Sequence, residues 1–317
     1  MKGEDLLGII LAAGKGTRML PFSESWPKPL LPIGGKPLLL HQIEAMRELG
    51  IREILIVIGH LGFEIVRNLG DGSIHGVSLK YVEQEETLGI AHAVGRLERH
   101  VDRPFLLFLG DIFFETRNLG RMIEKMGNGA KGDTAGVLAV KKEEDPLAIM
   151  RNFVVHLADD GSVRRVVEKP RHPRTNLKGC GLYLFDTAFF DAVRRTPRTA
   201  MRDEYEITDA IQIFIDDGWR VEAAEVVEED LNLSFPGDLL DLNLHFLESH
   251  GKDRILGNGV KIAEGAEVLR SVVMDGAVIE NPVMMKECLV FPGTIVSRTG
   301  KIRRMILTPE QEVPCSG

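Results

Sequence analysis

Two cationic side chains follow a glycine-rich turn near the start of the chain. The turn Gly14-Lys15-Gly16 comes after Leu6–Leu11, an apolar stretch typical of a buried strand. Such a turn lets backbone N–H groups approach phosphate oxygens without obstruction by side chains. Arg18 adds a forked donor suited to phosphate, and Lys28 adds a mobile point charge. The pattern indicates phosphate binding, against the alternative of a surface loop with two solvated cations.

The residues around this turn differ from two common nucleotide-binding motifs. The turn lacks the third glycine that a GxGxxG dinucleotide site requires, since Met19 stands at that position. The GxxxxGK[ST] loop of many ATP- and GTP-binding proteins is also missing here. We therefore expect a phosphate cradle of another kind, to which backbone N–H groups, Arg18 and Lys28 contribute.

Strand-like and helix-like segments alternate along most of the chain. The strand-like runs include Leu6–Leu11, Ile54–Ile58 and Phe105–Leu109, and the helix-like segments include Lys36–Leu49 and Gly89–Arg99. This alternation predicts an α/β fold with a Rossmann-like, mostly parallel sheet and flanking helices. Ligands bind beyond the carboxyl ends of the strands in such sheets. Gly14 and Asp111 both follow strand-like runs, so we expect them to share one site.

The whole stretch from Leu11 to Pro37 resembles the signature of the sugar-1-phosphate nucleotidylyltransferases. By resemblance, the nearest relatives are glucose-1-phosphate thymidylyltransferases of the long form. The resemblance implies that the turn holds a nucleoside triphosphate through Leu11, Ala12, Ala13, Gly14, Gly16 and Thr17. It also implies catalytic roles for Arg18, beside the leaving pyrophosphate, and for Lys28, beside the α-phosphate.

Further segments resemble the parts of the family that hold the nucleobase and the metal. Gln84 would hydrogen-bond the base, and Gly89 would let the backbone pack close beside it. Asp111 would bind Mg²⁺, although a lone aspartate after a strand is often a helix N-cap. The family's second metal ligand, the first aspartate of a D-x-G-x-P-x-D-L motif, is Asn232 here. The carbonyl oxygen of Asn232 can still bind Mg²⁺, with less charge, and Asp230 is a substitute ligand.

The sugar side of the site follows from a second set of matches. Glu168-Lys169-Pro170 resembles the family's EKP motif, in which the glutamate binds sugar hydroxyls and the lysine binds the sugar phosphate. Those three residues alone would indicate only a surface ion pair. Asn176 and Gly181 match the segment that lines the sugar pocket. Phe153 stands where relatives usually carry a glycine, so an unusual sugar or a cyclitol phosphate becomes a candidate acceptor.

Short glycine-led motifs replace the helical spacing from Gly257 onward. Gly265, Gly276 and Gly293 each begin a pattern of a glycine, a small residue and then β-branched residues. This pattern suits the tight corners of a hexapeptide β-helix and predicts a short left-handed one, with an irregular β tail as the alternative. We expect a catalytic domain over residues 1–250 and the β-helix with a tail over residues 251–317.

Composition limits the class of protein. The chain has 317 residues, of which 44% are hydrophobic and 27% charged, as is usual for globular proteins. A net charge of −8 disfavours a nucleic-acid binder, yet a few clustered cations can still attract a small anion. No apolar run approaches the roughly 18–20 residues that span a bilayer, and the amino terminus lacks the features of a secretory signal. We therefore expect a cytoplasmic protein with neither nucleic-acid nor membrane partners.

Together these features predict a Mg²⁺-dependent enzyme that transfers a nucleotidyl group from a nucleoside triphosphate to a sugar-1-phosphate. Lys169 would orient the attacking phosphate, whose oxygen is already anionic, so positioning and charge neutralisation should dominate. One alternative is a guanylyl- or cytidylyltransferase for a non-glucose acceptor. Another is a non-catalytic regulatory relative that binds sugar nucleotides. Such proteins typically lose the catalytic cations or the metal carboxylate, whereas this chain keeps Arg18, Lys28, Asp111 and Lys169. We also expect a homo-oligomer.

Overall fold

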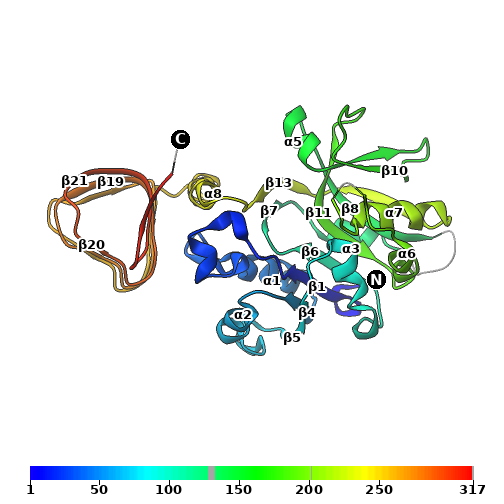
Figure 1. The fold of residues 1–317 in the computed structure, drawn as a ribbon, viewed down its shortest axis with the longest axis horizontal. Coiled ribbons are helices and arrows are strands. Elements are labelled where there is room, and N and C mark those ends of the chain that lie inside the picture. The colour runs from blue at the N-terminus through cyan, green and yellow to red at the C-terminus, as the bar shows by residue number, and fades with distance from the viewer. Residues whose placement is uncertain (128–132, 201, 316–317) are drawn as a thin grey trace. The chain divides into compact units, whose positions relative to one another are not determined.

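The chain forms two compact units in the computed structural model, which describes residues 1–127, 133–200 and 202–315. The first unit comprises Met1–Gly14 and Gln42–Asp230, and the second comprises Lys15–His41 and Leu231–Gly317. The glycine-rich turn therefore lies where the chain first passes from one unit to the other. Figure 1 shows the path of the chain through its elements. Among the described residues, no helix is both long and apolar enough to cross a membrane.

A nine-stranded sheet organises the described part of the first unit. Its strands are β1 (Leu7–Ala12), β4 (Glu53–Ile58), β5 (Ser78–Glu83), β6 (Phe105–Leu109), β8 (Thr134–Lys142), β9 (Phe153–Leu157), β10 (Val163–Glu168), β11 (Leu177–Phe185) and β12 (Arg220–Glu225). The order along the main path is β10-β9-β11-β6-β1-β4-β5, and β8 pairs with both β11 and β12. A separate pair joins β7 (Ile112–Thr116) to β13 (Val227–Asn232).

Parallel pairing holds where helices connect the strands. β1 pairs in parallel with β4 and β6, and β4 pairs in parallel with β5. The predicted α/β class, with a parallel Rossmann-like sheet and flanking helices, is confirmed for this half. The other half is mixed, because β11 runs antiparallel to β6 and to β8, and β9 and β10 form an antiparallel hairpin. The short connection between β9 and β10 permits only antiparallel pairing. β11 pairs with strands that are distant from it in the sequence, so the local alternation of strands and helices does not reveal its direction.

Helices complete the first unit. They are α1 (Leu38–Glu48), α2 (Gly62–Leu69), α3 (Ile90–Gly95), α4 (Gly120–Lys125), α5 (Pro146–Arg151), α6 (Phe189–Arg195) and α7 (Ile207–Asp216), and α1 begins in the second unit. The start of α5 shows how local residues fix a helix end. The Asp145 carboxylate accepts a hydrogen bond from the backbone N–H of Leu147 at 2.9 Å, and Pro146 occupies the first turn of α5. An N-cap carboxylate and an early proline are both typical of helix starts.

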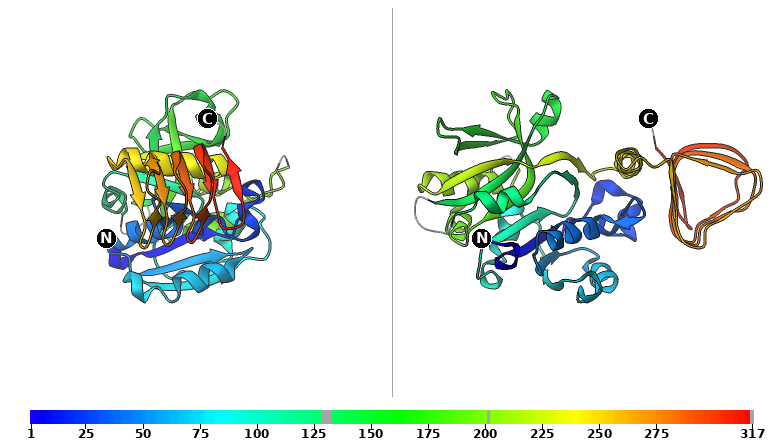
Figure 2. Two further views of the ribbon diagram at one scale, coloured as in Figure 1. Left: turned by 90° about the vertical axis from the view of Figure 1, so that its left-hand side faces the viewer. Right: turned by 180° about the vertical axis from the view of Figure 1, so that it is seen from behind.

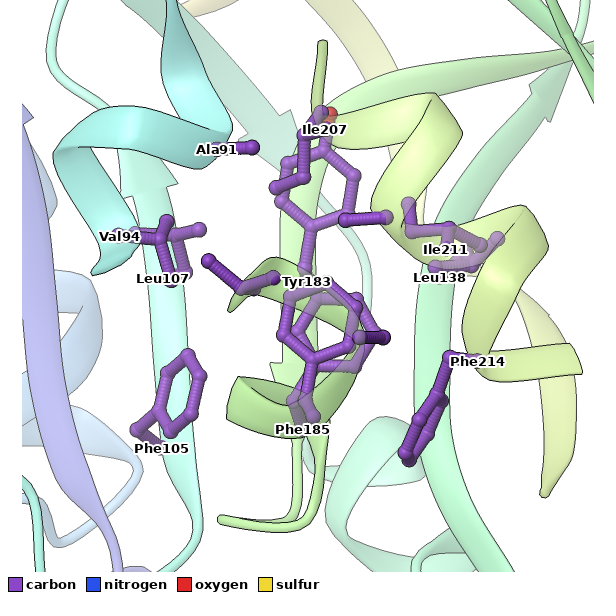
Figure 3. Close-up of a cluster of buried hydrophobic side chains, with 14 of the residues drawn as sticks. Ala91, Val94, Phe105, Leu107, Leu138, Tyr183, Phe185, Ile207, Ile211 and Phe214 are labelled. Carbon is purple, nitrogen blue, oxygen red and sulfur yellow. The ribbon is translucent and has the colours of Figure 1, made fainter. Parts of the chain in front are cut away.

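An aromatic cluster fills the space between β11, β6 and the helices α3, α6 and α7. The rings of Phe185 and Phe189 stack with centroids 3.8 Å apart, and Phe214 meets Phe185 edge to face at 6.4 Å. Tyr183 and Phe185 extend this cluster along β11 toward Phe105 (Figure 3). Burying such rings contributes about 1.5–3 kcal/mol each. This core therefore fixes β11, whose middle residue is the candidate sugar-site residue Gly181.

The second unit is built mainly from short strands at its carboxyl end. Its elements are β2 (Pro32–Ile33), β3 (Lys36–Pro37), α8 (Pro236–Ser249), β14 (Arg254–Leu256), β15 (Lys261–Ile262), β16 (Glu267–Leu269), β17 (Ser271–Val273), β18 (Val278–Ile279), β19 (Val283–Val290), β20 (Ile295–Val296), β21 (Gly300–Leu307) and β22 (Glu312–Pro314). One sheet follows the order β14-β17-β19-β21-β22, and a second follows β15-β18-β20. Figure 2 shows these strands stacked one behind another.

Parallel pairs in these sheets join residues seventeen positions apart, as in Arg254 with Ser271 and Leu289 with Ile306. Gly276 and Gly293 have positive φ angles of 69° and 68°, and Gly259 has a φ of 68° at the equivalent place one repeat earlier. Residues with side chains rarely adopt this conformation, which explains the glycines at these corners. The interval between Gly276 and Gly293 in the sequence is thus the repeat of the strands.

Candidate functional site

The carboxyl ends of three parallel strands meet in close backbone contact. The N–H of Gly110 donates to the carbonyl of Leu11 at 2.9 Å. A Cβ on Gly110 would lie 2.6 Å from that carbonyl oxygen, and a Cβ on Gly59 would lie 2.7 Å from the carbonyl oxygen of Ala13. Only glycine fits at Gly59 and Gly110 without a shift of the backbone. The residues just before the glycine-rich turn, Leu11 to Ala13, therefore lie beside the segment that carries Asp111.

A buried glutamine shapes the turn that carries Asp111. Asp111 lies between β6 and β7, and the side-chain N–H groups of Gln42 donate to the carbonyls of Leu109 and Ile112, both at 2.8 Å. Gln42 lies on α1 and is 2% exposed. Two hydrogen bonds from one rigid amide hold the two sides of the Asp111 turn together. Gln42 is therefore a positioning residue for the candidate metal ligand.

Gln84 and Gly89 lie on the segment between β5 and α3. The side chain of Gln84 is 6% exposed, and its amide N–H donates to the carbonyl of Glu86 at 2.7 Å. Gly89 has a φ of 108°, and a Cβ there would lie 2.5 Å from the carbonyl oxygen of Tyr205. The Tyr205 backbone also bonds to Leu88 and Ala91, at 2.8 and 3.0 Å. The close approach that Gly89 permits is thus to the backbone just before α7.

A charged cluster surrounds Glu168 at the end of β10. Arg202 bridges Glu168 at 3.2 Å and Glu206 at 2.9 Å, and the Lys169 ammonium lies 3.8 Å from the Glu168 carboxylate. The Thr208 hydroxyl donates to the other oxygen of Glu168 at 3.3 Å. Burial and the nearby Glu206 raise the pKa of the Glu168 carboxyl, while Arg202 and Lys169 oppose the shift. The cluster offers two cations and a hydroxyl-binding carboxylate to a ligand.

Lys169 has an unusual backbone as well as a position beside Glu168. Its φ is 42°, in the left-handed region that favours glycine, and its N–H donates to the carbonyl of Asn152 at 2.8 Å. Such strained residues occur most often at functional sites. The ammonium is partly exposed, with 44% of its side chain accessible. It can therefore contact both Glu168 and an anionic ligand.

Gly181, Phe153 and Asn176 occupy three different environments. Gly181 has a φ of 71°, and a Cβ there would lie 2.8 and 2.9 Å from the side chains of Ile112 and Leu109, which flank Asp111. The Phe153 ring is 5% exposed, covers Gly179 and stacks on Tyr183 at 6.1 Å. Asn176 is exposed. The structure brings Gly181 against the Asp111 turn, whereas Phe153 packs in the core.

The rest of the glycine-rich turn belongs to the second unit. Gly16 has a φ of 64°, and a Cβ there would lie 3.0 Å from the aliphatic stem of Lys28, which is 8% exposed. Thr17 begins a short 3₁₀ helix, Thr17–Met19, which carries the exposed side chain of Arg18. The Arg18 guanidinium lies 5.4 Å from the centre of the Phe235 ring. The structure therefore brings Gly16 and Lys28 together within this unit.

The segment after Asn232 is organised by a helix cap. Asn232 is the last residue of β13 and is exposed. The Asp238 carboxylate accepts hydrogen bonds from the N–H groups of Ser234 and Phe235, at 2.8 and 2.7 Å, at the start of α8. Asp111 belongs to the first unit and Asn232 to the second. Their joint binding of a metal ion stays a prediction.

Asp230 lies in a buried ionic cluster. Its carboxylate is 2.7 Å from the Lys178 ammonium and 3.6 Å from that of Lys141, and 1% of its side chain is exposed. Glu143 and Glu229 complete the cluster, at 3.5 and 2.8 Å from Lys141. Burial raises the pKa of the Asp230 carboxyl, while Lys178 and Lys141 oppose this shift. The two ammonium groups would repel a cation, which makes Asp230 a poor substitute for Asn232.

Two functional candidates escaped the sequence analysis. Gln42 stands on α1 among other polar residues, such as His41 and Glu44, so its type and position do not single it out. Its partners, Leu109 and Ile112, are distant in the sequence. Arg202 stands four residues before Glu206, an i,i+4 spacing that suggests an ion pair. Its second partner, Glu168, could be found only from the fold.

The Asp111 carboxylate is of the type that hard divalent cations prefer. Among the described residues, no group of three or more His, Cys, Asp and Glu side chains is arranged to hold a metal ion. Mg²⁺ usually binds through one or two carboxylates and takes its remaining oxygens from water and substrate phosphates. Asp111 can supply such a carboxylate.

Comparison with known proteins gives consistent matches over this part of the chain. Residues 7–230 match the nucleotidyl transferase family. The nucleotidyltransferase Agl11 of low-salt glycan biosynthesis in Haloferax volcanii is 35% identical over 76% of this chain and 66% of its own length. A glucose-1-phosphate thymidylyltransferase of Streptomyces antibioticus is 31% identical over 93% of this chain and 83% of its own length. A crystal structure from Bacillus anthracis, described as a glucose-1-phosphate thymidylyltransferase in complex with a sucrose, superposes with a TM-score of 0.66 at 27% identity, covering 76% of this chain and 95% of that one.

Proposed function

The chain belongs to the nucleotidyl transferase family, and from that premise we propose that it transfers a nucleotidyl group from a nucleoside triphosphate to a sugar-1-phosphate. The products are an NDP-sugar and pyrophosphate. The observation that carries this proposal is the hydrogen bond from the Gly110 N–H to the Leu11 carbonyl, 2.9 Å long. It holds the start of a phosphate-binding turn beside a carboxylate that can bind a divalent cation. The relatives named as thymidylyltransferases support dTTP as the first nucleotide to assay.

The triphosphate would lie along the glycine-rich turn. Backbone N–H groups from Leu11 to Thr17 would contact the phosphates, with Arg18 on the leaving pyrophosphate and Lys28 near the α-phosphate. Gln84 would contact the base through its amide, and Gly89 would keep the neighbouring backbone close. The exposed guanidinium of Arg18 and the buried stem of Lys28 support these two roles. Arg18 can reach outward, whereas Lys28 is held against Gly16.

The metal site and the acceptor site complete the proposal. The family's divalent cation is proposed to be Mg²⁺, held by Asp111 and Asn232, and when bound it would neutralise charge on the phosphates. Glu168, Asn176 and Gly181 would contact the sugar, with Phe153 behind them, and Lys169 would bind its phosphate. Arg202 joins this group, because it touches Glu168 at 3.2 Å and can offer a second cation to the acceptor phosphate.

The reaction requires an in-line displacement at the α-phosphorus. A phosphate oxygen of the sugar-1-phosphate forms the new P–O bond, and the bond to the pyrophosphate breaks. The nucleophile is already an anion, so no side chain has to remove a proton. Lys169 and Arg202 reduce its repulsion from the triphosphate, and the rigid turns around Leu11 and Asp111 keep the reacting groups aligned.

The remaining features are proposed from the sequence and, for the carboxyl-terminal strands, from their pairing. The parallel ladders with their seventeen-residue repeat support a short left-handed β-helix over residues 251–317, appended to a catalytic domain over residues 1–250. A homo-oligomer and a cytoplasmic location are proposed as well, together with the lack of nucleic-acid and membrane partners. Size-exclusion chromatography with light scattering would check the oligomer.

A substrate panel tests the proposed function. The purified chain would be incubated with Mg²⁺, each of dTTP, UTP, CTP, GTP and ATP, and several sugar-1-phosphates or cyclitol phosphates, while pyrophosphate release is measured. We expect release that depends on both substrates, and an NDP-sugar as the second product. Release with GTP or CTP and a non-glucose acceptor would identify one of the alternative transferases. Failure of every pair to release pyrophosphate would reject the catalytic proposal.

A further inference from the structure

A pocket of about 380 Å³ opens on the β9–β10 hairpin of the first unit. The basic residues that line it are Arg164, Arg165, Arg174, His156 and His172. Val154 and Val167 supply an apolar part of the lining, and Val154 is fully buried. The pocket thus combines apolar and basic side chains, and no carboxylate of the described residues lines it.

The strand register places this pocket away from Glu168. Arg165 pairs with His156 and Val167 pairs with Val154, whereas Glu168 pairs with Phe153. Paired residues lie on the same side of a sheet, and successive residues of a strand point to opposite sides. Arg164 lies where the register shifts between Val163 and Arg165, so this alternation is interrupted there. The side of Phe153 faces the buried core. The pocket therefore lies on the opposite side of the hairpin from the candidate sugar site.

The arginines of the pocket lack acidic partners among the described residues. The carboxylates nearest to them in sequence are bonded elsewhere, since Asp160 contacts Arg220 at 2.5 Å and Glu168 contacts Arg202 at 3.2 Å. Like charges on opposed positions of a hairpin repel each other, as Arg165 and a protonated His156 would. Burial lowers the pKa of the His156 imidazole, and Arg165, Arg164 and Arg174 lower it further. An anion in the pocket would relieve this repulsion.

We propose that this pocket binds a small phosphate-bearing anion at a site separate from the candidate active site. Arginine guanidinium groups bind phosphate oxygens through paired N–H donors and stack on flat organic groups. Small-molecule sites usually have volumes of about 300–1,000 Å³, so the pocket is larger than a single phosphate needs. Its ligand therefore carries two linked phosphates, or one phosphate and an organic part that contacts the partly exposed side chain of Val167.

Pyrophosphate titration of the full-length protein tests the proposal. The background variant R18A/K28A removes the cations of the glycine-rich turn, and leaving out Mg²⁺ prevents metal-assisted binding. The pocket and the Lys169–Arg202 pair then remain as sites for pyrophosphate, and the substitutions below distinguish them. We expect one saturable site in this background. Adding R164Q/R165Q/R174Q should weaken pyrophosphate binding at least tenfold. The matched control R121Q/R151Q/R171Q removes the same charge from exposed arginines outside the pocket and should change the affinity less than twofold.

Two results would overturn the proposal: no saturable binding in the R18A/K28A background, or equal weakening by the pocket and control substitutions. A second measurement covers the case in which the pocket variant does not fold. In the folded background protein, pyrophosphate should shift the NMR signals of the His156 and His172 rings and raise the pKa of His156, because a bound anion stabilises the protonated ring. Unchanged signals from both rings at saturating pyrophosphate would reject the site. Neither readout depends on whether the protein is a transferase.

Discussion

Gln42→Leu tests whether the Asp111 turn is held by the amide of Gln42. The substitution places an apolar side chain of similar size at a position where Gln42 is 2% exposed. It removes both 2.8 Å hydrogen bonds, to the carbonyls of Leu109 and Ile112. We expect loss of stability and of activity together, because the same two bonds support the fold and fix the candidate metal ligand.

The size of the stability loss follows from the two backbone carbonyls that would lose their hydrogen-bond donor. A buried polar group that loses its partner costs about 1–3 kcal/mol. The Ile112 carbonyl bond is buried and the Leu109 bond is partly buried, so the latter carbonyl can regain part of the loss from water. The sum is about 2–4 kcal/mol of unfolding free energy. A turn displaced by even 1 Å misplaces Asp111, for which about a hundredfold loss of kcat is expected.

Urea unfolding and pyrophosphate release measure the two effects. Arg47→Leu is the matched control, because Arg47 lies on the same helix and donates one bond to the His75 carbonyl at 3.2 Å, away from the Asp111 turn. The control should lose some stability and keep its kcat. A Gln42→Leu variant that unfolds within 0.5 kcal/mol of the parent, or that keeps full turnover, would refute the positioning role.

Three further perturbations follow from the geometry. Lys178→Met should destabilise the fold by about 2–4 kcal/mol in urea unfolding. Among the described residues, it leaves the buried Asp230 carboxylate with only Lys141 as a close cation. A loss no larger in Lys178→Met than in Lys178→Met/Asp230→Leu would contradict this. Gly89→Ala should cost at least about 2 kcal/mol, since φ is 108° and the new Cβ would meet the Tyr205 carbonyl at 2.5 Å; an unchanged melting temperature would count against it. Glu168 has a folded-state pKa above its ordinary value of 4.5, so its stabilising contribution is full below pH 4.5 and is lost as the pH rises through the folded-state pKa. Between pH 4.5 and the folded-state pKa of Glu168, the unfolding free energy of the parent should fall more than that of Glu168→Gln. The exposed control Glu144→Gln should show the same fall as the parent.

The parallel half of the sheet and the strand ends could be predicted from the sequence. Apolar runs of strand length, separated by segments with helical spacing, predict β1, β4 and β6. The rule for parallel sheets then predicts that Gly14 and Asp111 both follow the carboxyl ends of strands. The predicted enzyme class is confirmed by the family to which residues 7–230 belong. These successes rest on local patterns, which a single sequence carries directly.

Contacts between distant segments could not be predicted in the same way. Arg202 meets Glu168, and Gln42 meets the Asp111 turn, only because the sheet brings those segments together. The glycine at position 89 indicates a close backbone approach, but the sequence does not identify Tyr205 as the partner. The same holds for Phe153, whose burial over Gly179 depends on the register between β9 and β11.

Pyrophosphate release by Asp111→Ala tests the central claim most directly. The parent should release one pyrophosphate for each NDP-sugar formed with Mg²⁺ and its preferred substrate pair. The variant should retain the parent's circular dichroism spectrum and lose at least about a thousandfold in kcat, because it lacks the carboxylate that holds the cation on the phosphates. A folded Asp111→Ala protein that releases pyrophosphate at near the parent's rate would contradict the account.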